Sequence, residues 1–420
     1  MGRVPLRRNV GLGLTGILVA GSCAAALAQW TPVGSDAENQ AVAYSTTAPA
    51  DAVADLQRRL DEGLTALRYD RHTGYLSAVL HALHVPAASQ SLVFSRTSFQ
   101  RARISPAQPR ALYFNRDVYV GWVPGGAMLE IASIDPALGP VFYTLEQREI
   151  ARPRFERQTR ACLQCHDSPS STRGVPGLLM KSVPTDDAGE PIAAGGTYVT
   201  TDRSPASERW GGWYVTDGHR VPHMGLALAA GAITAPYLTG HSDPAALSVL
   251  AHQTSVQNLL THVGYRTRMA RHFDRQRNRD LGLSEEYVSD ATTRLIATVA
   301  EPLVRALLFV DEAPLVHPIA GTSGFAEMFG QQGPRDRRGR SLYEMDLTRR
   351  LLRYPCSYLI YSPAFEALPA PAKAYVYRRV WDVLSGRDAG RPFAHLTPAD
   401  RTAVLEILRD TKQEFTAYAP

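Results

Sequence analysis

The sequence has little excess of charge of either sign, few cysteines and almost no lysine. Its 420 residues include 45 Lys or Arg and 40 Asp or Glu, and lysine occurs only at positions 181, 373 and 412. Three of the arginines lie in the first 28 positions, which leaves 42 basic and 40 acidic residues in the rest of the chain. This balance argues against nucleic-acid binding, which uses a clustered basic surface.

The signatures of several common enzyme classes are missing as well. The chain has no Walker loop, no dinucleotide-binding glycine pattern, no G-x-S-x-G and no H-E-x-x-H, and it shows no internal repeat. Any chemistry must therefore come from a different constellation of residues.

Only four cysteines are present, and two of them stand close together. Cys162, Cys165 and His166 form the pattern C-x-x-C-H, whereas Cys23 and Cys356 are isolated. A zinc site would need a second pair of ligands at similar spacing, and a thioredoxin-type pair would follow a strand. On one helical turn the two thiols can share a face and bond one porphyrin, with the histidine as axial ligand of its iron. The motif therefore predicts one covalent haem c, with a redox pair or a short-loop disulfide as the alternatives.

Residues 1–28 have the pattern of a secretory signal peptide. Arginines precede an apolar run over 10–26, and Ala-Leu-Ala at 26–28 forms a small-residue cleavage site. Haem c is attached outside the bacterial cytoplasmic membrane, so an export signal agrees with the motif and predicts a periplasmic or otherwise exported protein. Two alternatives stay open, namely that the segment remains as a membrane anchor or that Cys23 is lipidated.

The rest of the chain predicts an α+β fold in three successive regions. These are a linker over 29–50, a haem c domain of helices and strands over 51–235, and a mostly α-helical region over 240–420 packed against it. Apolar spacing indicates helices over 51–68 and 74–84, before the strands. Strand-like segments separated by turn residues cover 91–95, 111–114, 118–123, 128–132 and 141–144, and a further strand-like stretch covers 177–216.

The C-terminal half carries the start signals of helices. Ser242, Asp243 and Pro244 open a helix that is expected to end near residue 263. A second helix is expected over 284–309, where Pro302 should kink or restart it. Two more are expected over 371–386 and 397–412.

A second axial ligand of the haem iron would distinguish an electron carrier from a catalyst. The loop over 217–225 offers His219, His223 and Met224, and Met224 or His223 is the expected distal ligand. His252 is a weaker candidate, because its apolar helical stripe favours a core histidine. An open distal position is the remaining possibility.

Five segments of the chain together resemble a known family. They are Arg110–Gly126, Cys162–His166, Arg209–Gly218, His223–Gly225 and Tyr354–Ser362. The family that they resemble consists of uncharacterised bacterial proteins described as cytochrome c domain-containing. The resemblance implies an exported protein with a single haem, and it implies no particular substrate.

The sequence thus predicts an exported monohaem c-type cytochrome that transfers electrons to redox proteins of the periplasm or cell envelope. A haem enzyme of the peroxidase or oxidase type, with an open or displaceable distal position, is the alternative. In such an enzyme His219, His223 or Arg220 would act as acid-base groups. Contact with a membrane is expected only if the N-terminal segment stays uncleaved or Cys23 carries a lipid.

Overall fold

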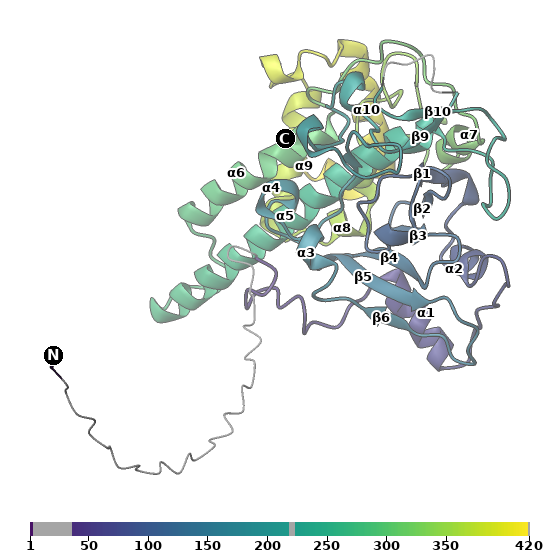
Figure 1. Ribbon diagram of the computed structural model, residues 1–420. Coiled ribbons are helices and arrows are strands. Elements are labelled where there is room, and N and C mark those ends of the chain that lie inside the picture. The colour runs from purple at the N-terminus through teal and green to yellow at the C-terminus, as the bar shows by residue number, and fades with distance from the viewer. Residues whose placement is uncertain (3–35, 218–222, 419–420) are drawn as a thin grey trace. The chain divides into compact units, whose positions relative to one another are not determined.

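An antiparallel sheet and a group of long helices make up the protein (Figure 1). The computed structural model describes residues 1–2, 36–217 and 223–418, and every element named below lies in one unit, Gly34–Pro420. Apart from its first two residues, the predicted signal peptide lies outside the described part of the chain. In the described ranges, none of the helices is both long enough and apolar enough to cross a membrane.

The sheet occupies the region where the sequence predicts strands. Its six strands pair in sequence order, each antiparallel to the next. Tight turns let neighbouring strands pair in this way. In the turn that begins at Asn115, the Asn115 side chain accepts hydrogen bonds from the backbone N–H groups of Asp117 and Val118. The strands are β1 (Ser91–Val93), β2 (Arg110–Phe114), β3 (Val118–Trp122), β4 (Met128–Asp135), β5 (Gly139–Glu146) and β6 (Phe155–Arg157).

The two faces of this sheet meet different partners, because successive side chains of a strand point to opposite sides. On one face the Tyr143 hydroxyl donates to Asp51 at 2.6 Å, and Asp51 caps α1 (Ala52–Asp61). On the other face the Phe142 ring lies 4.7 Å from the ring of His166. The Tyr119 hydroxyl, also on that second face, accepts a hydrogen bond from Gln253 at 2.6 Å. The C-x-x-C-H motif therefore lies on the face of the sheet opposite α1.

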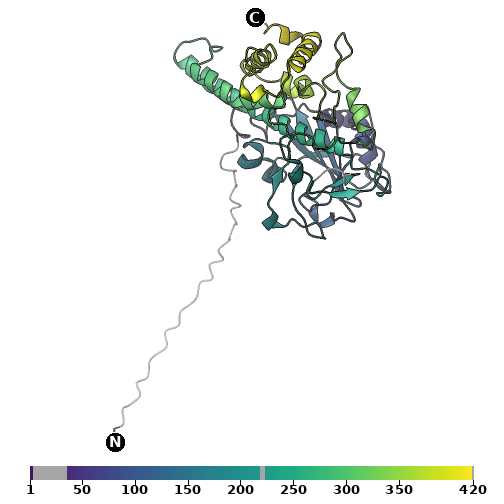
Figure 2. The same ribbon diagram turned by 90° about the horizontal axis from the view of Figure 1, so that it is seen from above.

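The helix that covers this second face is α5 (Pro244–Asp280), which runs between the sheet and the C-terminal helices (Figure 2). It continues well beyond the predicted end near residue 263. Its second half buries a polar helical stripe, in which Arg271 donates to the carbonyl of Tyr287 and Asn278 donates to that of Ser284. Hydrogen bonds to the following loop, rather than apolar spacing, support the extra turns.

The next helix, α6 (Asp290–Leu307), passes through Pro302 without ending. Of the two expected effects of this proline, a kink or a restart, the restart does not occur, because the helix is continuous. Proline removes one backbone hydrogen bond, but α6 packs along both α5 and α9 (Ala370–Leu384). The other helices are α2 (Leu76–Ala82), α3 (Leu163–His166), α4 (Pro169–Thr172), α7 (Phe325–Gly330), α8 (Pro363–Glu366), α10 (Pro398–Thr411) and α11 (Gln413–Thr416).

The predicted α+β class, with strands ahead of the motif and helices after it, is confirmed. The stretch over 177–216 is mostly irregular, because its strands are very short. They are β7 (Lys181–Ser182), β8 (Tyr198–Val199) and β9 (Tyr214–Thr216), and β9 pairs with β10 (Leu226–Leu228). Within the predicted linker, residues 36–50 pack on the sheet, since Tyr44 is fully buried and donates to the carbonyl of Pro140 at 2.9 Å.

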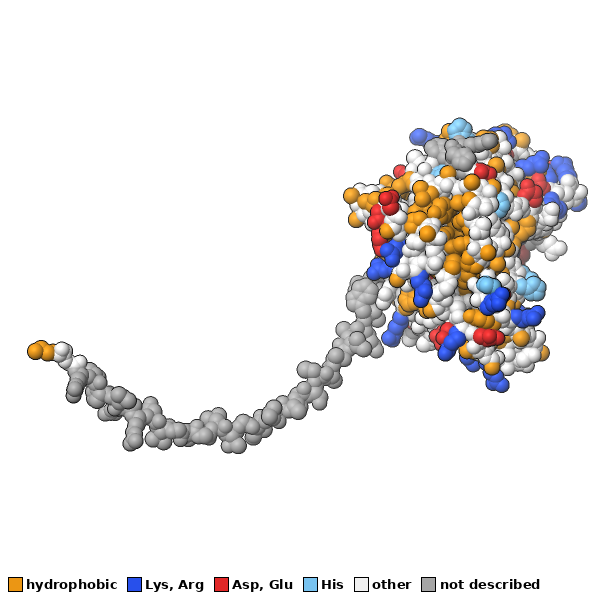
Figure 3. Space-filling model, turned by 45° about the vertical axis from the view of Figure 1, so that its right-hand side comes forward, with side chains coloured by type: hydrophobic (Ala, Val, Ile, Leu, Met, Phe, Trp, Pro, Cys, Tyr) orange, Lys and Arg blue, Asp and Glu red, His pale blue; other side chains and the backbone are white. Residues whose placement is uncertain are grey.

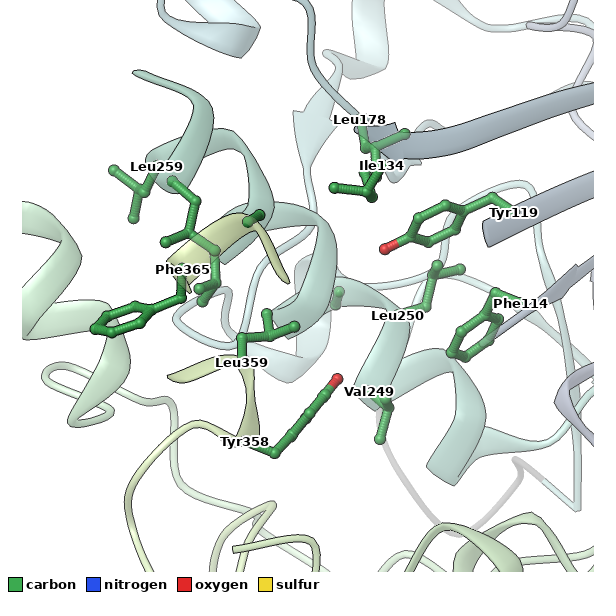
Figure 4. Packing of buried hydrophobic residues seen from close by; sticks show 14 of the residues in the cluster. Phe114, Tyr119, Ile134, Leu178, Val249, Leu250, Leu259, Tyr358, Leu359 and Phe365 are labelled. Carbon is green, nitrogen blue, oxygen red and sulfur yellow. The ribbon is translucent and has the colours of Figure 1, made fainter. Parts of the chain in front are cut away.

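A hydrophobic core joins the sheet to the helices (Figure 4). Tyr119 of β3 lies beside Leu178 and beside Leu250 of α5, so the core continues across the second face of the sheet. Tyr358 reaches the same helix from the C-terminal half, where its hydroxyl donates to Gln253 at 2.7 Å. These contacts hold the sheet, the loop after the motif and α5 in fixed relation.

Candidate haem-binding site

The C-x-x-C-H motif forms a short helical turn directly after the sheet. The backbone N–H groups of Cys165 and His166 both donate to the carbonyl of Cys162, at 3.2 and 3.0 Å. Leu163, which lies between the two cysteines, is buried and anchors the turn. The turn brings Cys162, Cys165 and His166 to the edge of one cavity.

His166 is tied to Gly177 by two hydrogen bonds. The backbone N–H of Gly177 donates to the carbonyl of His166, and the Gly177 carbonyl accepts from the His166 ring Nδ1, both at 2.8 Å. A carbonyl can only accept, so Nδ1 carries the proton and Nε2 keeps its lone pair. Burial lowers the pKa of His166, which favours the neutral ring. A neutral imidazole whose other nitrogen bonds a backbone carbonyl is the usual state of a metal-ligating histidine.

The loop that carries Gly177 is held in turn by α5. The Asn258 side chain accepts from the backbone N–H of Leu178 at 2.7 Å and donates to the Leu178 carbonyl at 2.8 Å. A Cβ at position 177 would lie 2.7 Å from the Thr172 Cβ and 2.8 Å from the Asn258 Oδ1. Glycine is therefore needed at 177 for the loop to approach both neighbours, and the orientation of His166 depends on α5.

The cavity beside the motif has a volume of about 490 Å³. This lies within the range of small-molecule and cofactor sites, roughly 300–1,000 Å³. Its walls come from the second face of the sheet, from the motif, from the loop after it and from α5. Among the described residues, the apolar and aromatic lining side chains include Leu112, Tyr119, Phe142, Leu178, Met180, Trp213 and Leu250. Three other aromatic side chains of this region, Trp122, Trp210 and Tyr214, are not among the described residues that line the cavity.

Basic side chains outnumber acidic ones along the lining of the cavity. Lys and Arg side chains are interspersed with Asp and Glu around a hydrophobic area on the face drawn in Figure 3. Among the described residues that line the cavity there are four cations, Arg96, Arg101, Arg110 and Lys181, and one carboxylate, Glu130. Arg96 also pairs with Glu190, outside the lining, at 2.8 Å. This excess suits a ligand that carries carboxylates.

Arg110 is the most constrained of these cations. It crosses Gly121 of β3, where a Cβ would collide with its guanidinium, and pairs with Glu130 at 2.8 Å. Its buried Nε has no hydrogen-bond partner in the described part of the structure. Such a donor is usually satisfied in the functional state of a protein.

The described cysteines, Cys162, Cys165 and Cys356, are free thiols. Burial, together with the charge of Glu130, raises the pKa of Cys162 to about 11, so this thiol stays protonated. Cys165 is exposed at the rim. Cys356 is fully buried, and burial raises its pKa to about 12, as expected for an inert core thiol. Cys23 lies outside the described residues.

The expected distal ligands are not brought to this cavity. Among the described residues, neither His223 nor Met224 borders it. His223 instead lies 5.5 Å from the ring of Trp210, and the Met224 backbone N–H donates to the carbonyl of Arg209 at 2.9 Å. His219 and Arg220 lie outside the described residues.

His252 is a core histidine, as its apolar surroundings indicate. Its Nδ1 lies 3.1 Å from an Asp202 carboxylate oxygen, and its Nε2 lies 2.8 Å from the Ser357 Oγ. The order Asp-His-Ser matches the relay of serine hydrolases. However, His252 and Ser357 are both 0% exposed, which leaves no surface for a substrate. The three residues therefore form a buried polar network that joins three separate segments.

The residues at the cavity fit a haem c. The two thiols can form the covalent bonds, the His166 Nε2 can bind the iron, the cations can pair with carboxylates, and the apolar walls can cover a porphyrin. No group of three or more His, Cys, Asp or Glu in the described ranges is placed to hold a metal ion. A haem iron needs fewer protein ligands than such a group supplies, because the porphyrin provides the equatorial ones.

Sequence reasoning identified the motif but not its supports. Gly177, Asn258 and the Arg110–Glu130 pair carry no local pattern that separates them from ordinary structural residues. Comparisons with protein families, with curated proteins and with solved structures found no match to this chain.

Proposed function

We propose that the protein is an exported monohaem c-type cytochrome that works in electron transfer. The observation that carries this proposal is the state of His166, whose Nδ1 is fixed by the Gly177 carbonyl while its Nε2 keeps a lone pair beside two free thiols. A thioredoxin-type pair or a disulfide would give no reason for a histidine held in this way.

Each residue has a distinct role in this proposal. Cys162 and Cys165 would hold the porphyrin covalently, each by adding its S–H group across one vinyl group, so that two C–S bonds would form and no atoms would be lost. His166 would hold the iron through Nε2, and the Gly177 hydrogen bond would make the ring a stronger donor. Phe142 packs against the ring and keeps water from it. The haem itself supplies reversible one-electron exchange.

The predicted signal peptide over 1–28 supports export, and periplasmic or envelope redox proteins are the proposed partners. Contact with a membrane belongs to the proposal only if the N-terminal segment is retained or Cys23 is lipidated. Nucleic acid is not a proposed partner, because basic and acidic residues nearly balance after position 28.

Expression of the full chain with a cytochrome c maturation system tests the proposal. We expect one haem per chain that stays bound after denaturation, measured by mass and by haem staining of a denaturing gel. The double variant Cys162→Ala/Cys165→Ala should lose covalent haem completely, whereas Cys356→Ala should keep it because that thiol lies in the core. A wild-type chain without covalent haem after maturation would refute the proposal.

The spectrum of the oxidised protein separates the carrier from the alternative, a haem enzyme. A six-coordinate low-spin iron that is reduced and reoxidised reversibly supports electron transfer. A high-spin iron that binds cyanide readily and turns over peroxide would favour the enzyme with an open distal position.

A further inference from the structure

Met180 borders the same cavity as the two thiols and His166. Met180 is a buried residue of the cavity wall, and it is the only methionine among the described residues that line the cavity, where His166 is the only histidine. A thioether with His on the opposite side of the iron is a ligand pair used by cytochromes c. Building on the proposed function, we propose that Met180, rather than His223 or Met224, is the second axial ligand of the haem iron.

The backbone on both sides of Met180 is fixed to its surroundings. Three residues earlier, Gly177 is bonded twice to His166. The Met180 carbonyl accepts from the backbone N–H of Thr200 at 2.8 Å, and the carbonyl of the next residue, Lys181, accepts from the Trp213 Nε1 at 2.7 Å. The segment that positions the proximal histidine therefore also holds Met180 at the cavity wall, and one loop can place both ligands.

The tyrosines at the cavity are poor candidates for this role. The Tyr143 side chain points to the other face of the sheet, where it donates its hydroxyl proton to Asp51 at 2.6 Å, and Tyr119 accepts from Gln253 at 2.6 Å. Burial raises the pKa of both phenols well above their usual range, which opposes formation of the phenolate that would bind iron. Their hydroxyl groups are thus committed to other elements.

A lysine that lines the cavity is another candidate for the second ligand of the iron. An amine binds iron only after it loses a proton, and a lysine side chain ordinarily holds that proton far above neutral pH. The thioether of Met180 has no proton to lose, and its flexible side chain adapts to the position of a partner. Ligation by Met180 therefore needs no change of protonation at neutral pH.

The test compares methionine variants of the full-length protein loaded with haem. The oxidised wild type should be low-spin, with a sulfur-to-iron charge-transfer band. Met180→Leu conserves the side-chain volume but cannot bind iron, so it should lose the band, become high-spin and bind added cyanide. It should also lose at least tenfold in preference for the ferrous state, a fall of about 59 mV or more in midpoint potential.

Two further variants distinguish ligation from packing. Met180→His should restore a low-spin iron without the sulfur band, because an imidazole can bind from the same position. Met224→Leu should keep the wild-type band and potential. Far-UV circular dichroism and thermal unfolding of each variant report whether it folds.

The proposal and the function on which it rests fail in different ways. Covalent haem whose charge-transfer band persists in Met180→Leu, or is lost in Met224→Leu, would overturn the assignment of Met180 and leave the cytochrome intact. Covalent haem with a high-spin iron in the wild type would also overturn it. A chain with no covalent haem at all would refute both.

Discussion

At the scale of single residues, the orientation of His166 depends on a glycine that touches no ligand. The carbonyl of Gly177 fixes the ring, and the position has no room for a Cβ between Thr172 and Asn258. Gly177→Ala should therefore displace the loop and lower the free energy of unfolding by about 1–3 kcal/mol, as for an overpacked core site. Urea unfolding measures the change, and the yield of covalent haem per chain should fall with it.

Gly264, inside α5, provides the matched control. The nearest atom to a Cβ there is 3.9 Å away, which is an ordinary contact. Gly264→Ala should leave the haem yield unchanged and add up to about 1 kcal/mol of stability, because alanine favours a helix interior. Equal effects of the two substitutions would show that position 177 is not specially constrained.

At the scale of elements, the start of α5 depends on Asp243, a fully buried N-cap. One carboxylate oxygen accepts from the backbone of Ala245 and Ala246, and the other accepts from Thr322 and from both the backbone and hydroxyl of Ser323. Asp243→Ala should cost about 2–4 kcal/mol in urea unfolding, more than a simple cap, because several buried donors lose their acceptor.

Ser289, the N-cap of α6, supplies the comparison. Its side chain accepts a single hydrogen bond, from the backbone N–H of Thr292 at 3.2 Å. Ser289→Ala should cost about 1 kcal/mol, the usual value for a lost cap. A cost for Asp243→Ala no larger than this would mean that the bonds to the 322–323 loop contribute little.

Elements set by local signals were predictable, and those set by distant contacts were not. The strands up to β5 follow from alternation and from turn residues such as Asn115, which act within a few positions. The final turns of α5 rest on Arg271 and Asn278, whose partners lie in the next loop, and α6 continues through Pro302 because of its neighbours.

At the scale of the whole molecule, the distinction between local signals and distant contacts also explains which parts of the site could be predicted from the sequence. The chemistry of C-x-x-C-H is local, so Cys162, Cys165 and His166 could be proposed from five adjacent positions. The cavity exists only after β2, β3 and β5 align and α5 crosses them, so its cations and Met180 could not be grouped beforehand. The loop over 217–225 was predicted to supply the distal ligand because it carries several potential iron ligands close together in the sequence. Closeness along the chain, however, does not place a residue at the cavity.

Stability of the whole molecule should depend on pH through Glu312. Burial raises its pKa to about 7, helped by the charge of Asp202 and opposed by the Leu351 N–H and by His252 and Arg350. The unfolded chain has the ordinary value of 4.5. Between these two values the folded state binds the proton more strongly, so the contribution of Glu312 to stability is greatest below about pH 4.5 and is lost as the pH rises through 7. The loss should be of order 1–3 kcal/mol, since one pKa unit corresponds to about 1.4 kcal/mol.

The variant Glu312→Gln isolates this contribution. A neutral amide keeps the shape of the protonated acid, so the variant should gain about 1–3 kcal/mol relative to wild type between pH 5 and pH 8 in urea unfolding. Glu149→Gln, at an exposed position, is the control and should change the pH profile little. Groups far from position 312 titrate alike in wild type and variant, so their effects cancel, and the difference reports Glu312 together with the neighbouring charges that interact with it. A difference that stays constant between pH 5 and pH 8 would mean that Glu312 is already ionised in the folded protein near pH 5, and that this partly buried side chain is paired more strongly than its surroundings indicate.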